Sequence, residues 1–235
     1  MLIAFASGSR GNFYAVDDGT TVLAMECGLS FRKMQALCGH QIARFAACLV
    51  SHEHMDHAKA VPDLLARGIV VYMSGGTAEA LEISHPLLRI LKPLQTVRIG
   101  SFSVKPFPIE HDAQEPFGFL IASRTLKRKL LFATDTQCIR YTFRGVQEMA
   151  VECNYADDLL AVSDLPEVVK TRITKSHMGL ETVKQFLGAC DLSKTERIYL
   201  LHLSGHHGQG ERFCREIREL TGIETVIAGR QTRDT

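Results

Sequence analysis

A short cluster of polar side chains constrains this chain more than any other feature of its sequence. The segment SHEHMDHAKAV, residues 51–61, contains His52, His54, Asp56 and His57. It directly follows FAACLV, residues 45–50, an apolar run that predicts a buried strand. Imidazole nitrogens and carboxylate oxygens are the usual protein ligands of zinc, manganese and iron. The cluster therefore favours a metal site at a strand end over the alternative, a polar surface loop.

The spacing within this cluster favours two metal ions. His52 and His54 alternate along an extended segment or tight turn. Asp56 and His57 fall where a helix is expected to begin, with Asp56 as a candidate cap. Such a turn can direct four ligands into one pocket, but not onto one ion. Two imidazoles on one side and an aspartate with a histidine on the other suit two adjacent ions.

A two-metal site needs further ligands, and three later residues lie where predicted strands end: His111, Asp135 and His202. Taken singly, each also fits a capping or hydrogen-bonded residue. Beside an incomplete set of ligands they become candidate ligands, because strand ends can meet at one sheet edge. The carboxylate of Asp135 can bridge two ions, with one oxygen bound to each.

Apolar runs and the turn residues between them predict a mixed α/β fold. Strands are expected at residues 2–7, 12–16, 21–25, 45–50, 69–73, 95–99, 102–109, 117–122, 129–134, 149–154, 197–204 and 224–229. Helices are expected at residues 30–39, 57–67, 76–83, 165–174, 179–188 and 207–221. This order predicts a two-sheet core with helices on its outer faces. With 235 residues and no linker or repeat, residues 1–235 are expected to form a single domain.

Composition excludes several classes of protein. The seven cysteines are scattered and contain no C-x-x-C pair, which indicates reduced thiols in a cytoplasmic protein. The start of the chain has no basic segment typical of a signal peptide, and no apolar run approaches the roughly 20 residues of a membrane span. The net charge of +1 gives no global field that would attract nucleic acid. Any nucleic-acid contact must therefore depend on local clusters.

At these residues the chain resembles the metallo-β-lactamase superfamily. Its H-x-H-x-D-H motif is matched by residues 52–57, and the later ligands follow in order. The resemblance is greatest to the YycJ/WalJ-type branch of DNA exonucleases, at SGSRGN (7–12), HDAQEPFGF (111–119), VECN (151–154) and LHLS (201–204). The chain departs from that branch at Glu26, where aspartate is usual.

This resemblance implies an α/β fold, the four-layer αββα sandwich, with the metal site at one edge of the sheets. It also implies how the ligands divide between two divalent ions. His52, His54 and His111 would hold one ion; the other would be held by Asp56, His57 and His202, with Asp135 between the two. Zinc or manganese is expected, with iron as the alternative.

The predicted function is that of a dinuclear metal-dependent phosphodiesterase, a nuclease of the exonuclease type that acts on DNA through a metal-bridging hydroxide. Asp56 would hold one ion and orient that hydroxide, and His177 would protonate the leaving oxygen. A surface histidine that caps the helix at 179 fits His177 equally well. The alternative function is hydrolysis of a small ester, thioester or lactam, and a third is a non-catalytic metal-bound module.

A nucleic-acid substrate, with DNA favoured over RNA, should leave traces of positive charge near the site. Lys170, Arg172 and Lys175 lie directly upstream of His177 and could contact phosphates. Charge runs are more often solvated faces. The position next to a candidate catalytic histidine favours this cluster over other basic runs.

Two glycine-rich segments could add further contacts. The turn SGSRGN offers free backbone N–H groups and the side chains of Ser9 and Asn12, which could cradle a phosphate. A plain β-turn is the alternative for this segment. His206, between Gly205 and Gly210, is a further candidate metal-binding residue.

Overall fold

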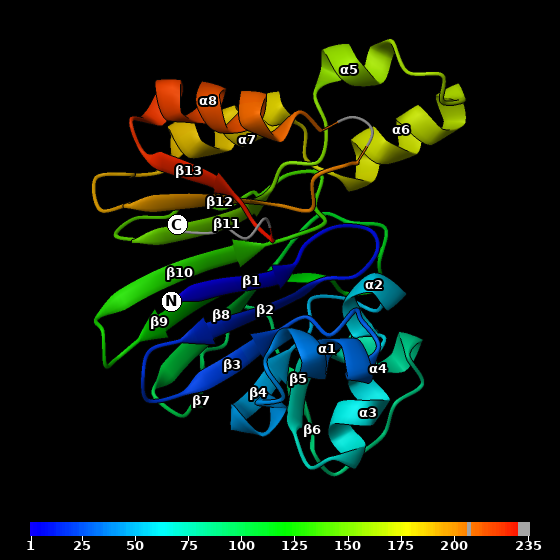
Figure 1. The fold of residues 1–235 in the computed structure, drawn as a ribbon, viewed down its shortest axis with the longest axis vertical. Helices are drawn as coiled ribbons and strands as arrows, with labels where there is room; N and C mark the ends of the chain where they lie inside the picture. The colour runs from blue at the N-terminus through cyan, green and yellow to red at the C-terminus, as the bar shows by residue number, and fades with distance from the viewer. Residues whose placement is uncertain (206–207, 230–235) are drawn as a thin grey trace.

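Two β-sheets pack face to face, and helices cover the outer face of each (Figure 1). The computed structural model describes residues 1–205 and 208–229. The first sheet has the strand order β1-β2-β3-β4-β5-β6, and the second has the order β13-β12-β11-β10-β9-β8-β7. Both sheets mix parallel and antiparallel pairs. The expected four-layer αββα sandwich is confirmed.

The first half of the chain builds the first sheet and its helices. Its strands are β1 (Leu2–Ala6), β2 (Phe13–Asp17), β3 (Val22–Met25), β4 (Phe45–Leu49), β5 (Val70–Ser74) and β6 (Leu88–Leu91). Its helices are α1 (Phe31–Leu37), α2 (Met55–Ala58), α3 (Val61–Ala66) and α4 (Gly75–Ala80), with a 3-10 turn at Ile42–Arg44.

The second half builds the second sheet and the remaining helices. Its strands are β7 (Val97–Ile99), β8 (Phe102–Pro108), β9 (Phe117–Ser123), β10 (Arg128–Ala133), β11 (Glu148–Glu152), β12 (Arg197–Leu201) and β13 (Glu224–Ile227). Its helices are α5 (Asp157–Ala161), α6 (Glu167–Ser176), α7 (Leu180–Ala189) and α8 (Gly210–Thr221). Helices α7 and α8 cover the sheet, whereas α5 and α6 extend beyond its edge (Figure 1).

Alternation of apolar residues along the strands produces the layers. In β2, Tyr14 and Val16 pack between the two sheets, while Phe13 and Ala15 pack toward the helices of the first sheet. In β10 the residues likewise alternate between the central layer and the layer under α7 and α8. Successive side chains of a strand point to opposite faces, so strands that are apolar on both faces must lie between two layers.

The predicted elements match the structure with a few corrections. Every expected strand is present within three residues at each end, but β6 was not predicted, because this edge strand exposes Ile90 and has no clear alternation. The helix expected at 57–67 is two helices, α2 and α3, and α5 was not predicted. Asp56 does not cap α2: the N-cap position is His54, and Asp56 lies in the first turn.

The later part of the chain adds two observations. Helix α8 begins at Gly210, three residues after the predicted start at 207. His206 lies outside the described residues. Among the helices of residues 1–205 and 208–229, none has both the length and the hydrophobicity of a membrane span.

Candidate metal centre

Seven of the predicted metal-binding residues lie at one edge of the sandwich, and His206 is outside the described residues. His52 and His54 follow β4, His111 follows β8, Asp135 follows β10 and His202 follows β12. Strands β10, β11 and β12 run parallel, so their C-terminal ends meet at the same edge. Ligand sites of α/β sheets form outside these C-terminal strand ends. The short helix α2 adds Asp56 and His57 to the same place.

The predicted ligands form two groups whose potential ligand atoms lie within 4.8 Å of one another, and a third such group joins Asp135 and His202 to Glu152 and His177. The first, here called the imidazole cluster, contains His52, His54 and His111. The second, the mixed cluster, contains Asp56, His57, Asp135 and His202. The two clusters adjoin, because the ring centroids of His52 and His57 are 4.2 Å apart. The sequence therefore predicted which residues come together.

The imidazole cluster has neutral hydrogen-bond partners. Nδ1 of His52 lies 2.8 Å from Oγ of Ser51, and Nδ1 of His111 donates to the carbonyl oxygen of Ser176 at 2.8 Å. Nε2 of His111 lies 3.1 Å from Nδ1 of His54. Burial lowers the pKa of His52 well below its ordinary value, and burial also lowers the pKa of His111. These rings favour the neutral form, which is the form that binds a metal ion.

The mixed cluster combines carboxylates with imidazoles. Nε2 of His57 lies 3.3 Å from Asp135 and 3.5 Å from Asp56, and Nε2 of His202 lies 3.5 Å from Asp56. Burial alone would lower the pKa of His202, but Asp135 and the other nearby carboxylates raise it to about 10. Burial would raise the pKa of Asp135, yet His202 and His57 hold it well below its ordinary value. Without a metal ion, protons on the histidines balance the carboxylates.

Two buried glutamates contact the Nδ1 atoms of the histidines in the mixed cluster. Oε2 of Glu26 lies 3.4 Å from Nδ1 of His57, and Oε1 of Glu152 lies 3.2 Å from Nδ1 of His202. Glu152 is fixed in turn by the backbone N–H groups of Thr136 and Met178. Neither glutamate was predicted as a site residue. Each nevertheless lies at or just past a strand end, β3 or β11, which is the signal that identified the ligands.

Three of these residues have left-handed backbone conformations. The φ angle is 61° at Glu26, 43° at Asp135 and 50° at His202. Positive φ at a residue other than glycine costs about 1–3 kcal/mol and occurs preferentially at functional sites. The surrounding structure therefore holds these side chains at the sheet edge against a local backbone preference.

The donor atoms fit metal ions. Nε2 of His52 and Nε2 of His202 are buried and have no hydrogen-bond partner among the described residues. The other ring nitrogen of each histidine is fixed, by Ser51 for His52 and by Glu152 for His202. Buried polar atoms are rarely left without a partner, and a ligating histidine usually donates its other nitrogen to such a fixed group.

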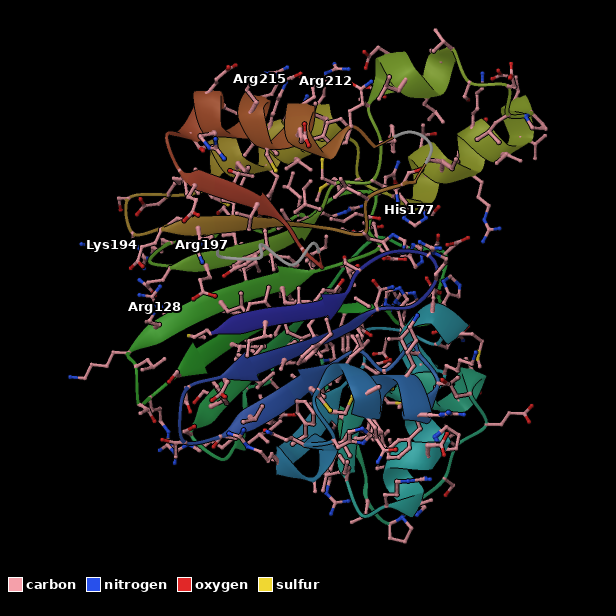
Figure 2. The ribbon with its side chains drawn as sticks, in the orientation of Figure 1. Arg128, His177, Lys194, Arg197, Arg212 and Arg215 are labelled. Atoms are coloured by element: carbon pink, nitrogen blue, oxygen red, sulfur yellow. The ribbon has the colours of Figure 1, made fainter. Side chains whose placement is uncertain are left out.

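A cavity of about 290 Å³, here called the site cavity, opens over both clusters. Besides the metal-binding side chains, Ser9, Asp112, Arg172 and His177 line it. His177 lies at the base of α6, facing the sheet edge (Figure 2). Its ring stacks on that of His202 at 5.4 Å between centroids. It does not cap the helix that begins at Leu180, because the N-cap position is Gly179.

His177 is held by an ion pair. Its Nδ1 lies 2.6 Å from Oε1 of Glu152, and its side chain is 20% exposed. Burial would lower the pKa of His177, but Glu152 raises it above the ordinary value. His177 therefore holds its proton to a higher pH than a free imidazole does, and it still lines the cavity.

The predicted substrate-binding residues have different surroundings. Ser9 and Arg172 line the site cavity, and Arg172 forms an ion pair with Asp112 at 3.1 Å. Asn12 is fully buried, and its side chain binds the backbone of Gly8 and Asp56. Lys170 donates to the carbonyl oxygen of Ala161 and does not line the cavity. Asn12 therefore holds the turn in place, and Lys170 binds α5.

Comparisons with known proteins agree with this geometry. Residues 21–203 match the family described as "Beta-lactamase superfamily domain". Exodeoxyribonuclease YycJ of Bacillus anthracis is 31% identical over 215 residues, which cover 85% of this chain and 80% of that protein. Exodeoxyribonuclease WalJ of Streptococcus pneumoniae is 30% identical over 246 residues, 94% of this chain and 86% of that protein.

The fold is also similar to solved structures. The metallo-beta-lactamase fold protein YhfI of Bacillus subtilis superposes on this chain with a TM-score of 0.72. The superposition covers 97% of this chain and 95% of YhfI. Its sequence identity is 16%, so this likeness concerns the fold alone. The family match and the two exonuclease relatives confirm the expected resemblance.

Proposed function

The chain belongs to the metallo-β-lactamase superfamily, in its YycJ and WalJ branch, and we propose that it is a two-metal phosphodiesterase that hydrolyses DNA as an exonuclease. At the coarser level it is a metal-dependent hydrolase. One observation carries the proposal: the imidazole and mixed clusters adjoin beneath one cavity, and His177, paired with Glu152, lines the same cavity.

The residues that would hold the metal ions follow from the two clusters. The imidazole cluster would hold one divalent ion, Asp56, His57 and His202 the other, and Asp135 would lie between them. Nitrogen and oxygen donors of this kind suit zinc or manganese, with iron as the alternative. When bound, such a pair supplies an activated water and neutralises charge on a phosphate.

Asp56 is the residue best placed to orient the attacking water. Its carboxylate lines the site cavity and its side chain is 25% exposed, whereas Asp135 is only 3% exposed. The pKa of Asp56 is held far below its ordinary value by His202 and His57, despite burial. An ionised carboxylate at the cavity accepts a hydrogen bond from water and fixes its direction.

His177 is the residue that donates a proton to the leaving oxygen. An alkoxide leaving group of DNA needs a proton, and His177 lines the cavity with a pKa that Glu152 raises despite burial. Glu152 accepts a hydrogen bond from Nδ1, which fixes the ring and leaves Nε2 to donate. Ser9 and Arg172, at the cavity wall, are the candidates for contacts with the scissile phosphate.

The cysteines support a cytoplasmic location. All seven lie within the described residues, all are free, and four are buried. Free buried thiols are typical of proteins in reducing compartments.

The test is a cleavage assay with the protein loaded with manganese or zinc. The substrates are end-labelled single-stranded and duplex DNA and the corresponding RNA, and the Asp135→Asn variant is the control. We expect mononucleotide release from DNA by the wild type, with no cleavage by the variant. A protein that hydrolyses thioesters or lactams but no phosphodiester would overturn the proposal, as would equal activity of the variant.

A further inference from the structure

A second and larger cavity adjoins the site cavity. Its volume is about 810 Å³, and we call it the side groove. It is lined by residues 5–11, Lys33, Leu203, Gly205 and Gly229. Ser9 lines both cavities, and Leu203 directly follows His202 of the mixed cluster. The side groove therefore continues from the catalytic edge over the turn SGSRGN, and its volume falls within the roughly 300–1,000 Å³ typical of ligand pockets.

The side groove carries unbalanced positive charge. Arg10 and Lys33 line it, both are exposed, and none of its lining residues within 1–205 and 208–229 is acidic. Neither side chain has an ion-pair or hydrogen-bond partner within residues 1–205 and 208–229. Two cations that face a groove without a counter-ion favour an anionic ligand.

Several basic side chains elsewhere in the molecule are neutralised by acidic partners. Arg172, in the site cavity, is paired with Asp112. Arg128 and Arg197 are each paired with a glutamate, and both lie at the end of the sheets away from His177 (Figure 2). Among the Lys and Arg residues that line the two cavities, Arg10 and Lys33 of the side groove are therefore the ones without an acidic partner within residues 1–205 and 208–229.

The turn that forms the floor of the groove adds uncharged donors. The backbone N–H groups of Ser9 and Arg10 have no acceptor among the described residues. Asn12 fixes the turn by accepting from the N–H of Gly8 at 2.9 Å. Successive free N–H groups in such a turn form a concave site for anions. The buried position of Asn12 is explained by this role as a support.

The groove also has an aromatic wall. Phe5 stacks on Phe13 with ring centroids 4.8 Å apart, and Phe5 remains partly exposed to the groove. Proteins that bind single-stranded nucleic acid combine a basic groove for the backbone with aromatic rings on which bases stack. An unpaired base can reach Phe5, whereas a base within a duplex is already stacked.

We propose that the side groove binds a single strand of DNA on one side of the scissile phosphate, with Arg10 and Lys33 contacting backbone phosphates. The proposal rests on the proposed nuclease function for the identity of the strand. It predicts that longer strands bind more tightly than a substrate that fills only the site cavity. It also predicts that the gain is electrostatic and depends on salt.

The test compares two double variants that remove the same charge. Arg10→Gln with Lys33→Gln removes it from the groove, and Lys194→Gln with Arg215→Gln removes it from exposed positions that Figure 2 places away from His177. Binding of a short fluorescein-labelled phosphorothioate strand, which resists hydrolysis, is measured by anisotropy across salt concentrations with metal-loaded protein. Michaelis constants are measured for an oligonucleotide and for bis-p-nitrophenyl phosphate.

We expect the groove variant to bind the strand more weakly. The slope of log Kd against log salt concentration should also fall by about 1.4, because each phosphate contact on a single strand contributes about 0.7 to this slope. Its KM should rise for the oligonucleotide and much less for the small diester. The control variant should match the wild type. A groove variant that behaves like the control in binding would overturn the proposal.

Failure of the nuclease function gives a different pattern. The wild type would then hydrolyse neither the oligonucleotide nor the small diester. The anisotropy measurement still decides the groove proposal, because binding through Arg10 and Lys33 does not require cleavage.

Discussion

The imidazole cluster and the mixed cluster lie side by side beneath one cavity, yet their electrostatics are opposite. The imidazole cluster contains no carboxylate, and its outer partners are a serine hydroxyl, a backbone carbonyl and the exposed carboxylate of Asp112, 3.4 Å from Nε2 of His111. The mixed cluster contains two aspartates, with Glu26 and Glu152 behind its histidines. Accordingly, the pKa of His52 is lowered by burial, while the pKa of His202 is raised to about 10 by carboxylates.

The difference indicates separate contributions to metal binding. A cation at the imidazole cluster would be held by three imidazole nitrogens, with the carboxylate of Asp135 placed between the two clusters. A cation at the mixed cluster also neutralises carboxylates that are buried, and it must displace protons from His57 and His202. The mixed cluster should therefore respond more strongly to loss of charge, and the imidazole cluster to loss of a ligand atom.

The largest effect is expected from Asp135→Asn, which removes the charge placed between the clusters. Several kcal/mol of transition-state stabilisation depend on such a metal pair, so DNA cleavage should fall about a thousandfold or more. Metal content, measured by elemental analysis, should fall from about two ions per chain. His54→Ala is the matched change in the imidazole cluster and should leave about one ion. A wild type with a constant content of one ion would contradict the two-cluster scheme.

A second expected loss concerns His177, whose ring lies against His202 of the mixed cluster and His111 of the imidazole cluster but belongs to neither. His177→Ala should reduce DNA cleavage at least about a hundredfold, which is typical of a lost general acid. The loss should be much smaller for bis-p-nitrophenyl phosphate, because its phenolate leaving group needs no proton. Equal losses on both substrates would contradict the role of His177 as the acid, and would indicate a structural role beside His202.

The sequence predicted the residues of both clusters from the short motif at 52–57 and from three residues that follow strand ends, His111, Asp135 and His202, while the family resemblance implied their division between two ions. It did not identify Glu26 and Glu152, since a single acid at a strand end looks the same whether it supports a histidine or caps the strand. The sequence also did not show which side chains of a helix point into the cavity. Arg172 reaches the cavity while Lys170, two residues earlier, binds Ala161, and this depends on how α6 packs.

The same limit applies to the fold. Strands with clear runs of apolar residues were found, because they are buried between layers. The edge strand β6 was missed, since its residues are mostly exposed and only Leu91 is buried. Asn12 was a candidate phosphate ligand by its position in a glycine-rich turn, yet it is buried because tertiary contacts with Gly8 and Asp56 use its amide.

The hydrogen-bond partners of the metal-binding histidines allow a further test of the difference between the two clusters, with a smaller expected effect. Glu152→Gln keeps the shape but removes the charge behind His202 and His177. Loss of such a partner lowers metal affinity about 10–100-fold, and the effect should fall on the mixed cluster. Ser51→Ala removes the neutral partner of His52 and should lower affinity less. Competition titration with a chromophoric chelator measures both, and a larger effect for Ser51→Ala would reverse the ranking of the clusters.

The smallest effect is expected in the pH dependence of stability of the metal-free protein. The pKa of His202 is about 10 when folded, against 6.5 as the ordinary value, so its contribution is complete below pH 6.5 and is lost as the pH rises toward 10. The pKa of His52 is lowered, so its contribution is lost as the pH falls below 6.5. Urea unfolding with chelator should therefore show stability that declines with pH above 6.5.

The control for this decline is His202→Gln, because buried cysteines also contribute a decline above their ordinary pKa. The difference in free energy of unfolding between wild type and variant should shrink steadily from pH 6.5 to pH 10. A difference that stays constant over this range would mean that His202 does not hold a proton in the folded, metal-free protein. Another group would then compensate the negative charge of the carboxylates in the mixed cluster. The two clusters would still differ in charge, but only because the mixed cluster contains Asp56 and Asp135.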